Sequence, residues 1–271
     1  MKILSADSDD GTRLRSVRWG DGPRDVLLVH GLAEHAGRYE HVAQRLVDAD
    51  YRVTMVELRG HGESEGQRGH TRAWHRYVED LQIGGNLIRR PLAIVAHSMG
   101  GLVTLDALRE PFTPKVLGVA LSNPLVRPAT TLSDVRVRAV NALSKYLPFL
   151  PIRTELDTAL LSRDRDVVLA YEADPSVYPT VTVRWATEMM AATERIAGEP
   201  PTLEVPLRLM LGTADGICDP TASKEMAARW PGPTEILAYE GAYHELFNEP
   251  DKAVVLDGLV EWLDTLEWPD A

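Results

Sequence analysis

The sequence has few of the features that mark extracellular, membrane-spanning or nucleic-acid-binding proteins. Its 271 residues include a single cysteine, Cys218, which excludes an internal disulfide and favours a reducing compartment. No apolar run approaches the ~18 residues of a membrane span, and residues 1–10 become acidic too early for a signal peptide. The net charge of -11 argues against nucleic acid and against general adhesion to anionic membranes. We therefore expect a cytoplasmic protein with no nucleic-acid partner.

What remains is an ordinary globular composition, with 44% hydrophobic and 25% charged residues and without internal repeats. An N-terminal hairpin is followed by apolar segments typical of buried strands, which alternate with amphipathic helical patterns. This alternation predicts parallel β-α-β units, and we expect an eight-stranded, mostly parallel α/β sheet flanked by helices. After the hairpin strands, the expected strands cover residues 26–29, 52–57, 92–96, 116–121, 207–211 and 235–239.

Residues 124–204 interrupt the alternation, because they show helical patterns and prolines but no strand of the earlier kind. We therefore divide the chain into a core of residues 1–123 and 205–271 and a helical insertion. Two apolar helical faces are expected in the insertion, either packed on one another or covering an apolar pocket as a lid. The first face comprises Leu132, Val135, Ala139, Leu143 and Leu147, and the second comprises Val181, Trp185, Met189, Ala192 and Ile196.

Residues 92–108 read as a buried strand, one tight corner and a helix, with Ser98 at the corner. Ala96 and Gly100 flank the serine at two positions on either side, where only small side chains let strand and helix approach. The pattern A-x-S-x-G differs from the usual G-x-S-x-G by one methyl group. By itself the pentapeptide does not distinguish a nucleophilic serine from an ordinary serine in a turn. The flanking strand and helix favour a nucleophile elbow, in which the serine hydroxyl is exposed in front of a helix N-terminus.

A serine nucleophile needs a general base and a carboxylate that orients it. Seven of the eight histidines precede Ser98, and with this type of elbow the chain order is serine, acid, histidine, so His244 is the expected base. The acid should follow the preceding strand, which favours Asp215. The alternative is Asp219, but an aspartate directly before a proline is typical of a helix N-cap.

The oxyanion formed during attack needs two backbone N–H donors, one directly after the serine and one in a loop after an earlier strand. Met99 and Leu32 occupy these positions. We expect His30, His61 and His97 to be structural loop or elbow residues.

Five ordered blocks carry a resemblance: HGLAEHAGRY at 30–39, RGHGESEGQRGH at 59–70, AHSMGG at 96–101, GTADGICD at 212–219 and YEGAYHELFNE at 239–249. With them the chain resembles the monoacylglycerol lipase and lysophospholipase branch of the α/β-hydrolase superfamily, over nearly its full length outside the insertion. The resemblance implies an α/β-hydrolase fold with residues 124–204 as a cap after the sixth strand, lining an acyl tunnel. It also implies that Glu34 and Arg38 lie beside a glycerol pocket, and a loop salt bridge is the alternative for that pair.

The expected reaction is hydrolysis of a lipid ester, most directly monoacylglycerol, through an acyl-enzyme on Ser98 and without a cofactor or metal. A lysophospholipase, a carboxylesterase, a thioesterase and a carbon–carbon bond hydrolase remain alternatives within the enzymes. A dehalogenase or epoxide hydrolase would need aspartate in place of Ser98. A binding protein that keeps a hydrolase pocket for ligand sensing is the alternative from another class.

Charge is uneven along the insertion. Residues 124–153 carry five basic side chains and one acid, giving +4, whereas residues 154–204 carry four basic and ten acidic side chains, giving -6. Arg136 falls within the first apolar face. Either that helix packs on the core with Arg136 ion-paired, or this half of the insertion rests transiently on a lipid–water interface. Cys218 is expected to be either a buried inert thiol or a site where a bulky reagent blocks substrate.

Overall fold

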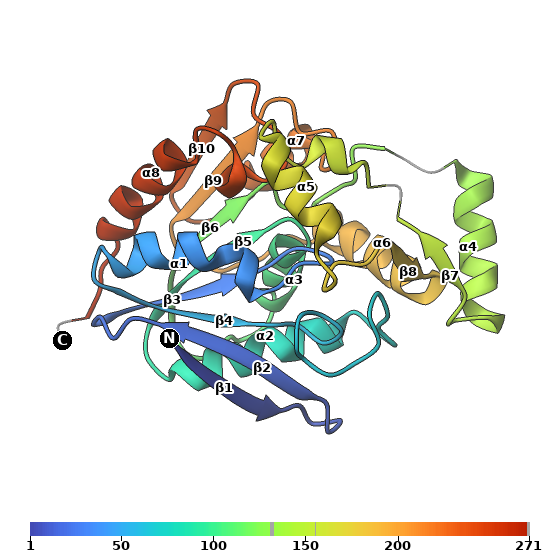
Figure 1. The fold of residues 1–271 in the computed structure, drawn as a ribbon, viewed down its shortest axis with the longest axis horizontal. Helices are drawn as coiled ribbons and strands as arrows, with labels where there is room; N and C mark the ends of the chain where they lie inside the picture. Colours follow the sequence, from blue (N-terminus) through green and yellow to red (C-terminus); the bar gives the residue numbers. More distant parts are fainter. Residues whose placement is uncertain (131–132, 155, 270–271) are drawn as a thin grey trace.

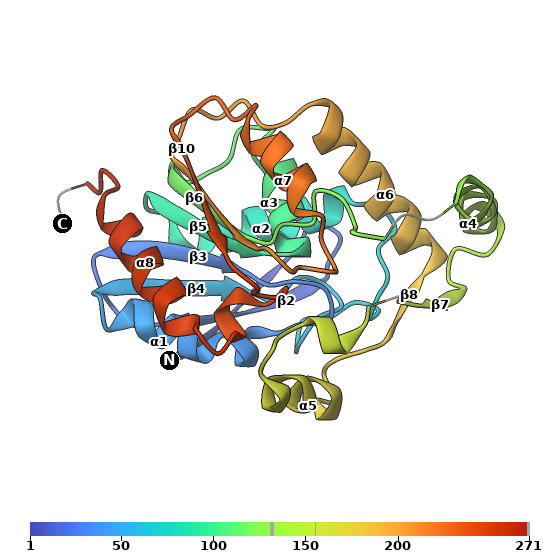
Figure 2. The same ribbon diagram turned by 90° about the horizontal axis from the view of Figure 1, so that it is seen from above.

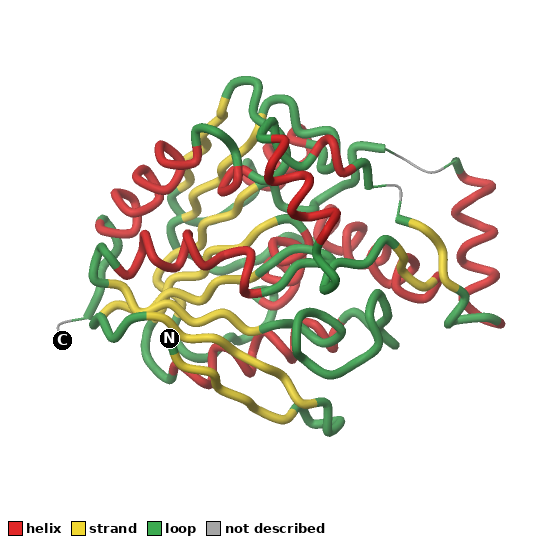
Figure 3. The backbone as a smooth tube through the Cα atoms, in the orientation of Figure 1, coloured by secondary structure: helices red, strands yellow, loops and turns green. Residues whose placement is uncertain are grey.

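The computed structural model describes residues 1–130, 133–154 and 156–269. Within these ranges one twisted eight-stranded sheet forms the centre of the molecule (Figures 1 and 3). Its order is β1-β2-β4-β3-β5-β6-β9-β10, in which β1/β2 and β2/β4 are antiparallel and the other pairs are parallel. The predicted eight-stranded, mostly parallel sheet is therefore confirmed. Its strands are β1 (Lys2–Asp7), β2 (Arg13–Trp19), β3 (Arg24–Val29), β4 (Tyr51–Val56), β5 (Leu92–His97), β6 (Val116–Ser122), β9 (Leu207–Gly212) and β10 (Thr234–Tyr239).

Helices cover both faces of the sheet (Figure 2). Helices α1 (Glu40–Val47) and α8 (Lys252–Asp264) pack on one face, whereas α2 (His75–Ile88), α3 (Met99–Ala107) and α7 (Pro220–Ala227) pack on the other. The buried strand β3 alternates between the two cores, since Val26 and Leu28 face α1 and α8 while Leu27 and Val29 face the opposite layer. In the described part of the chain, no helix is both long and apolar enough to cross a bilayer.

The segment between β6 and β9 contains α4 (Asp134–Tyr146), β7 (Pro151–Arg153), α5 (Arg165–Ala173), β8 (Thr180–Thr182) and α6 (Val183–Gly198). Among the described residues of this segment no strand joins the main sheet, as expected, but β7 and β8 form a small antiparallel pair that the sequence analysis did not predict. Each of these strands has three residues, too few for an alternating pattern to stand out in the sequence.

The two apolar faces predicted in this segment have different outcomes. On α6, Trp185, Ala192 and Ile196 are buried in the core beside α3, which confirms the second face. On α4, Val135 is 75% exposed and Leu143 is 37% exposed, so the predicted first face is wrong. The two helices do contact one another, as one alternative expected, but through another side of α4, where Oγ of the buried Ser144 lies 3.0 Å from Oγ1 of Thr187. Leu132 lies outside the described residues. Helix α4 lies at the edge of the molecule, beyond α6 and away from the main sheet (Figure 1).

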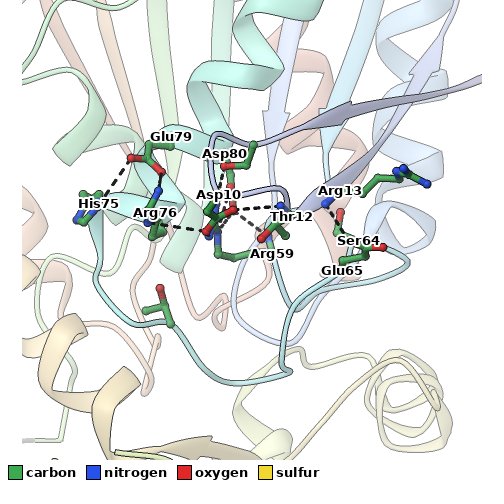
Figure 4. A network of polar contacts seen from close by, with 12 residues as sticks. Asp10, Thr12, Arg13, Arg59, Ser64, Glu65, His75, Arg76, Glu79 and Asp80 are labelled. Atoms are coloured by element: carbon green, nitrogen blue, oxygen red, sulfur yellow. Dashed lines mark hydrogen bonds and ion pairs between the residues drawn. The ribbon is translucent and has the colours of Figure 1, made fainter. Parts of the chain in front are cut away.

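A polar network fastens the loop after β4 to α2 and to the β1–β2 hairpin (Figure 4). Arg59 donates to both carboxylate oxygens of Asp80, at 2.6 and 2.9 Å, and to Asp10 at 2.7 Å. Because Asp80 is fully buried, the ionised form of its carboxylate depends on the ion pair with Arg59. The backbone N–H of Arg13 donates to Glu65 at 3.0 Å on the other side of the loop. The loop is therefore held on either side of His61, at Arg59 and at Glu65.

Candidate active site

Ser98 occupies a strained corner between β5 and α3. Its φ of 52° and ψ of -121° place a non-glycine residue in a conformation that L-residues rarely adopt. The helix can begin so close to the sheet only because Gly100 has no side chain, since a Cβ there would lie 2.5 Å from the carbonyl oxygen of His30 and 2.7 Å from that of Val29. The predicted need for a small residue at this position is confirmed.

The structure brings Ser98, His244 and Asp215 together in one chain of hydrogen bonds. Nε2 of His244 lies 2.9 Å from Oγ of Ser98, and Nδ1 of His244 lies 2.9 Å from Oδ2 of Asp215. All three residues are buried. With Nδ1–H donating to the carboxylate, Nε2 is left as an acceptor for the serine hydroxyl, which is the arrangement that proton removal from the serine requires.

Backbone donors orient Asp215 toward His244. Its Oδ1 accepts hydrogen bonds from the N–H groups of Ile217 at 2.8 Å and Cys218 at 3.0 Å, which leaves Oδ2 for the imidazole. Asp219 instead caps α7 by accepting from the N–H of Thr221 at 2.8 Å, and it forms an ion pair with Arg127. The predicted N-cap role of Asp219 is confirmed.

The electrostatics of the site single out His244 among the neighbouring histidines. Burial disfavours the imidazolium, but the charge and hydrogen bond of Asp215 outweigh it, so the pKa of His244 is raised. Burial lowers the pKa of His97 to about 4 and that of His61 to about 3, so both are neutral near pH 7. Nδ1 of His97 faces the carbonyl oxygen of Ser122, and Nδ1 of His61 faces that of Arg59. These contacts fit the structural roles expected for them.

The expected oxyanion donors lie on either side of Ser98. Met99 is the first residue of α3, and the first N–H groups of a helix have no partner within the helix. Leu32 lies in the loop after β3, which passes so close to the nucleophile that a Cβ on Gly31 would be 3.2 Å from Cβ of Ser98. Glu34 fixes that loop by accepting from the N–H of Gly31 at 2.7 Å. The assignment of Leu32 and Met99 stays a prediction.

Glu34 and Arg38 belong to a buried ion-pair network. Nε of Arg38 lies 3.2 Å from Oε1 of Glu34, and the Arg38 guanidinium also pairs with Glu245 at 2.6 Å and covers the ring of Tyr171. Burial raises the pKa of Glu34, but His97 and Arg38 outweigh it and hold that pKa well below its usual range. The salt-bridge interpretation is confirmed, whereas contact with substrate stays a prediction. Sequence reasoning missed Glu245, although it directly follows the expected base.

Cys218 is 1% exposed, and burial raises the pKa of its thiol well above the usual range. This environment fits the inert-thiol alternative. Asp215, Cys218 and His244 each place one potential ligand atom within 4.8 Å of the others. Both ring nitrogens of His244 already have partners, Nδ1 in Asp215 and Nε2 in Ser98, so this cluster does not leave His244 free as a metal ligand.

Comparisons with known proteins agree with this geometry. The family described as serine aminopeptidase, S33, matches residues 23–251. A monoacylglycerol lipase of Mycolicibacterium smegmatis is 34% identical over 245 residues, covering 88% of this chain and 87% of that protein. An uncharacterized abhydrolase domain-containing protein of Dictyostelium discoideum is 31% identical over 242 residues; the match covers 88% of this chain but only 26% of that longer protein.

A solved structure extends the likeness to three dimensions. The crystal structure of a Paleococcus ferrophilus monoacylglycerol lipase has a TM-score of 0.85 and 28% identity, covering 97% of this chain and 98% of that one. The chain therefore belongs to the monoacylglycerol lipase family of α/β-hydrolases, within the family described as serine aminopeptidase, S33.

Proposed function

We propose that this enzyme is a serine ester hydrolase that cleaves monoacylglycerol to a fatty acid and glycerol. The observation that carries the proposal is the pair of 2.9 Å contacts that joins Ser98 to His244 and His244 to Asp215. The relatives named monoacylglycerol lipase supply the substrate class.

In the first half of the reaction, Oγ of Ser98 attacks the ester carbonyl while Nε2 of His244 takes its proton. The Asp215 carboxylate holds the imidazole in the required tautomer and stabilises the imidazolium. The N–H groups of Leu32 and Met99 donate to the oxyanion. When the tetrahedral intermediate collapses, His244 returns the proton to the departing glycerol oxygen, and the acyl group remains on Ser98.

In the second half, water replaces the alcohol. His244 takes a proton from the water, the hydroxide attacks the acyl-enzyme, and Ser98 leaves with the proton that His244 returns. The fatty acid is released and the serine is restored. Glu34 and Arg38 would contact the glycerol hydroxyls, a role that their position next to the loop of Leu32 supports.

Residues 124–204 would act as a cap between the core segments 1–123 and 205–271, and would line the path of the acyl chain. We also propose transient contact between α4 and lipid. The exposed apolar side chains on and after α4 support this contact, together with the +4 charge of residues 124–153. The single cysteine still favours the cytoplasm as the place of action.

A substrate series tests the proposal. Rates on monoacylglycerols of increasing acyl length should exceed those on simple short esters, lysophospholipids and thioesters of the same acyl group. An aminoacyl anilide belongs in the same series because the family description names an aminopeptidase. A faster rate on the anilide would overturn the lipid substrate. Failure of Ser98 to react with a fluorophosphonate probe, together with no turnover of any substrate, would favour a ligand-binding protein.

A further inference from the structure

The turn that follows β6 contacts the segments that carry all three members of the Ser98–His244–Asp215 chain. The N–H of Ser98 donates to the carbonyl of Ser122 at 3.1 Å, and the N–H of Leu125 donates back to the carbonyl of Ser98 at 2.9 Å. Between these two contacts lies Asn123, which is 1% exposed and has a φ of 41°. Few non-glycine residues adopt a positive φ, so this conformation points to a specific role for the buried side chain of Asn123.

Each polar position of the Asn123 amide has a partner. Oδ1 accepts from the N–H of Gly212 at 2.9 Å, and Nδ2 donates to the carbonyl of His244 at 2.6 Å and to that of Tyr243 at 3.1 Å. The partners fix the orientation of the amide, because Gly212 supplies a donor and the other two supply acceptors. Aspartate has no donors for the two carbonyls, and serine is too short to reach all three groups.

These bonds join the loops on which Asp215 and His244 lie. Gly212 ends β9, three residues before Asp215, and it packs so tightly on the other loop that a Cβ there would lie 2.4 Å from the carbonyl oxygen of Tyr243. The backbone of Asn123 adds a third tie, since its N–H donates to the carbonyl of Met210 at 2.9 Å.

We propose that Asn123 is a positioning residue that sets the distance between Asp215 and His244 by binding the backbone of both loops. The inference rests on the proposed function, because those two residues matter most if they move protons. Asn123 itself does not touch the reacting atoms. The imidazole of His244 contacts Ser98, Asp215 and His97, and the charges of Glu245 and Glu34 also act on it. A shift of the His244 loop would therefore change the 2.9 Å contacts to both Asp215 and Ser98.

The test is Asn123→Gly, because glycine tolerates the positive φ and removes only the side-chain bonds. We expect kcat to fall by about ten- to a hundredfold, as small misplacements of catalytic groups do, with KM changed less than about twofold. The pKa of His244, followed by NMR, should fall because its contact with Asp215 is weakened. This readout does not depend on turnover, so it separates failure of the inference from failure of the proposed function.

Asp25→Asn is the matched control. Asp25 is fully buried and bonded to Arg52 at 2.7 Å, but it lies at the start of β3, at the opposite end of the strands from the site. The Asp25→Asn substitution should lower the unfolding temperature and leave kcat and the pKa of His244 unchanged.

Asn123→Ser, which keeps a hydroxyl, provides a second variant if the glycine variant folds poorly. It should lower kcat and the pKa of His244 in the same direction as Asn123→Gly. If the Asn123 variants lose stability while kcat and the pKa of His244 stay at wild-type values, the side chain has only a structural role and the inference fails.

Discussion

At His244, two opposing effects determine the pH at which the site can act. Burial lowers the pKa of the imidazole, and the Asp215 carboxylate raises it by more, so the pKa lies above the ordinary 6.5. Because only the neutral imidazole can accept the Ser98 proton, kcat/KM for a soluble ester should fall as pH is lowered through that value. Rates measured between pH 5 and 9, with circular dichroism to confirm folding, check this. A constant rate down to pH 5 would contradict the role of His244 as base.

The two aspartates near the site should respond differently to the same substitution. Asp215→Asn removes the carboxylate that faces Nδ1 of His244, and we expect kcat to fall on the order of 10⁴-fold. Asp219→Asn weakens a helix cap and an ion pair, so it should lower the unfolding temperature slightly and leave kcat within about twofold. Steady-state kinetics and thermal unfolding of both variants test whether Asp215 is the carboxylate that orients His244. A larger loss of activity in Asp219→Asn than in Asp215→Asn would contradict this assignment.

Chain order limits the choice of candidate site residues, and the structure places the chosen residues within hydrogen-bond distance of one another. Only one histidine follows Ser98, so His244 had no competitor, and Asp219 could be set aside because the proline after it marked a cap. Glu245 and Asn123 belong to no such pattern. Their roles come from contacts between loops far apart in the sequence, such as the bonds from Asn123 to Gly212 and His244.

Among the secondary-structure elements, the strands of the sheet could be predicted from the pattern of apolar residues, whereas the packing of α4 could not. A strand such as β5 is buried on every residue, and a short apolar run that ends at a tight corner is typical of such a strand. For α4, periodicity identified an apolar face but not its neighbour, because an apolar face can be buried by protein or by lipid. The structure leaves Tyr146 83% exposed and Phe149 56% exposed, beside Leu143 and Leu147.

If α4 contacts lipid, its basic residues should tune activity at an interface. Arg136→Glu combined with Arg138→Glu should remove the stimulation that anionic lipid gives on emulsified monoacylglycerol, and salt should weaken that stimulation in the wild type. Hydrolysis of a soluble short ester should be nearly unchanged. Lys115→Glu with Lys224→Glu makes the same charge change at exposed sites outside α4, and should leave the stimulation intact. Equal loss on both substrates, or on neither, would contradict an interfacial role.

For the molecule as a whole, polar contacts add to the apolar packing of α6 in fastening the segment between β6 and β9 to the rest of the chain. The hydroxyl of Tyr178 lies 2.7 Å from Nε2 of His61, and Nε2 of His35 lies 2.7 Å from Asp174. The N–H of Thr182 donates to the carbonyl of Gly69 at 2.8 Å. The sequence could not predict these pairs, because each joins residues about 110 or more positions apart.

The Tyr178 contact should contribute measurably to stability. In Tyr178→Phe, Nε2 of His61 is left buried without its partner, which costs about 1–3 kcal/mol and should lower the unfolding temperature by several degrees. Tyr146→Phe makes the same chemical change on an exposed ring of α4 and should have no effect. Thermal unfolding compares the two. Equal midpoints would mean that the contact does not hold the segment to the core.

The central claim is that Ser98 and His244 act together in one proton-transfer unit. The most direct measurement is kcat on monoacylglycerol for Ser98→Ala, His244→Ala and the double variant, with the exposed His75→Ala as control and unfolding temperatures for all four. Each single variant should lose about 10⁴-fold or more, the double variant should be little worse, and the control should match the wild type. A folded single variant that keeps kcat within tenfold of the wild type, or losses that multiply in the double variant, would contradict the account.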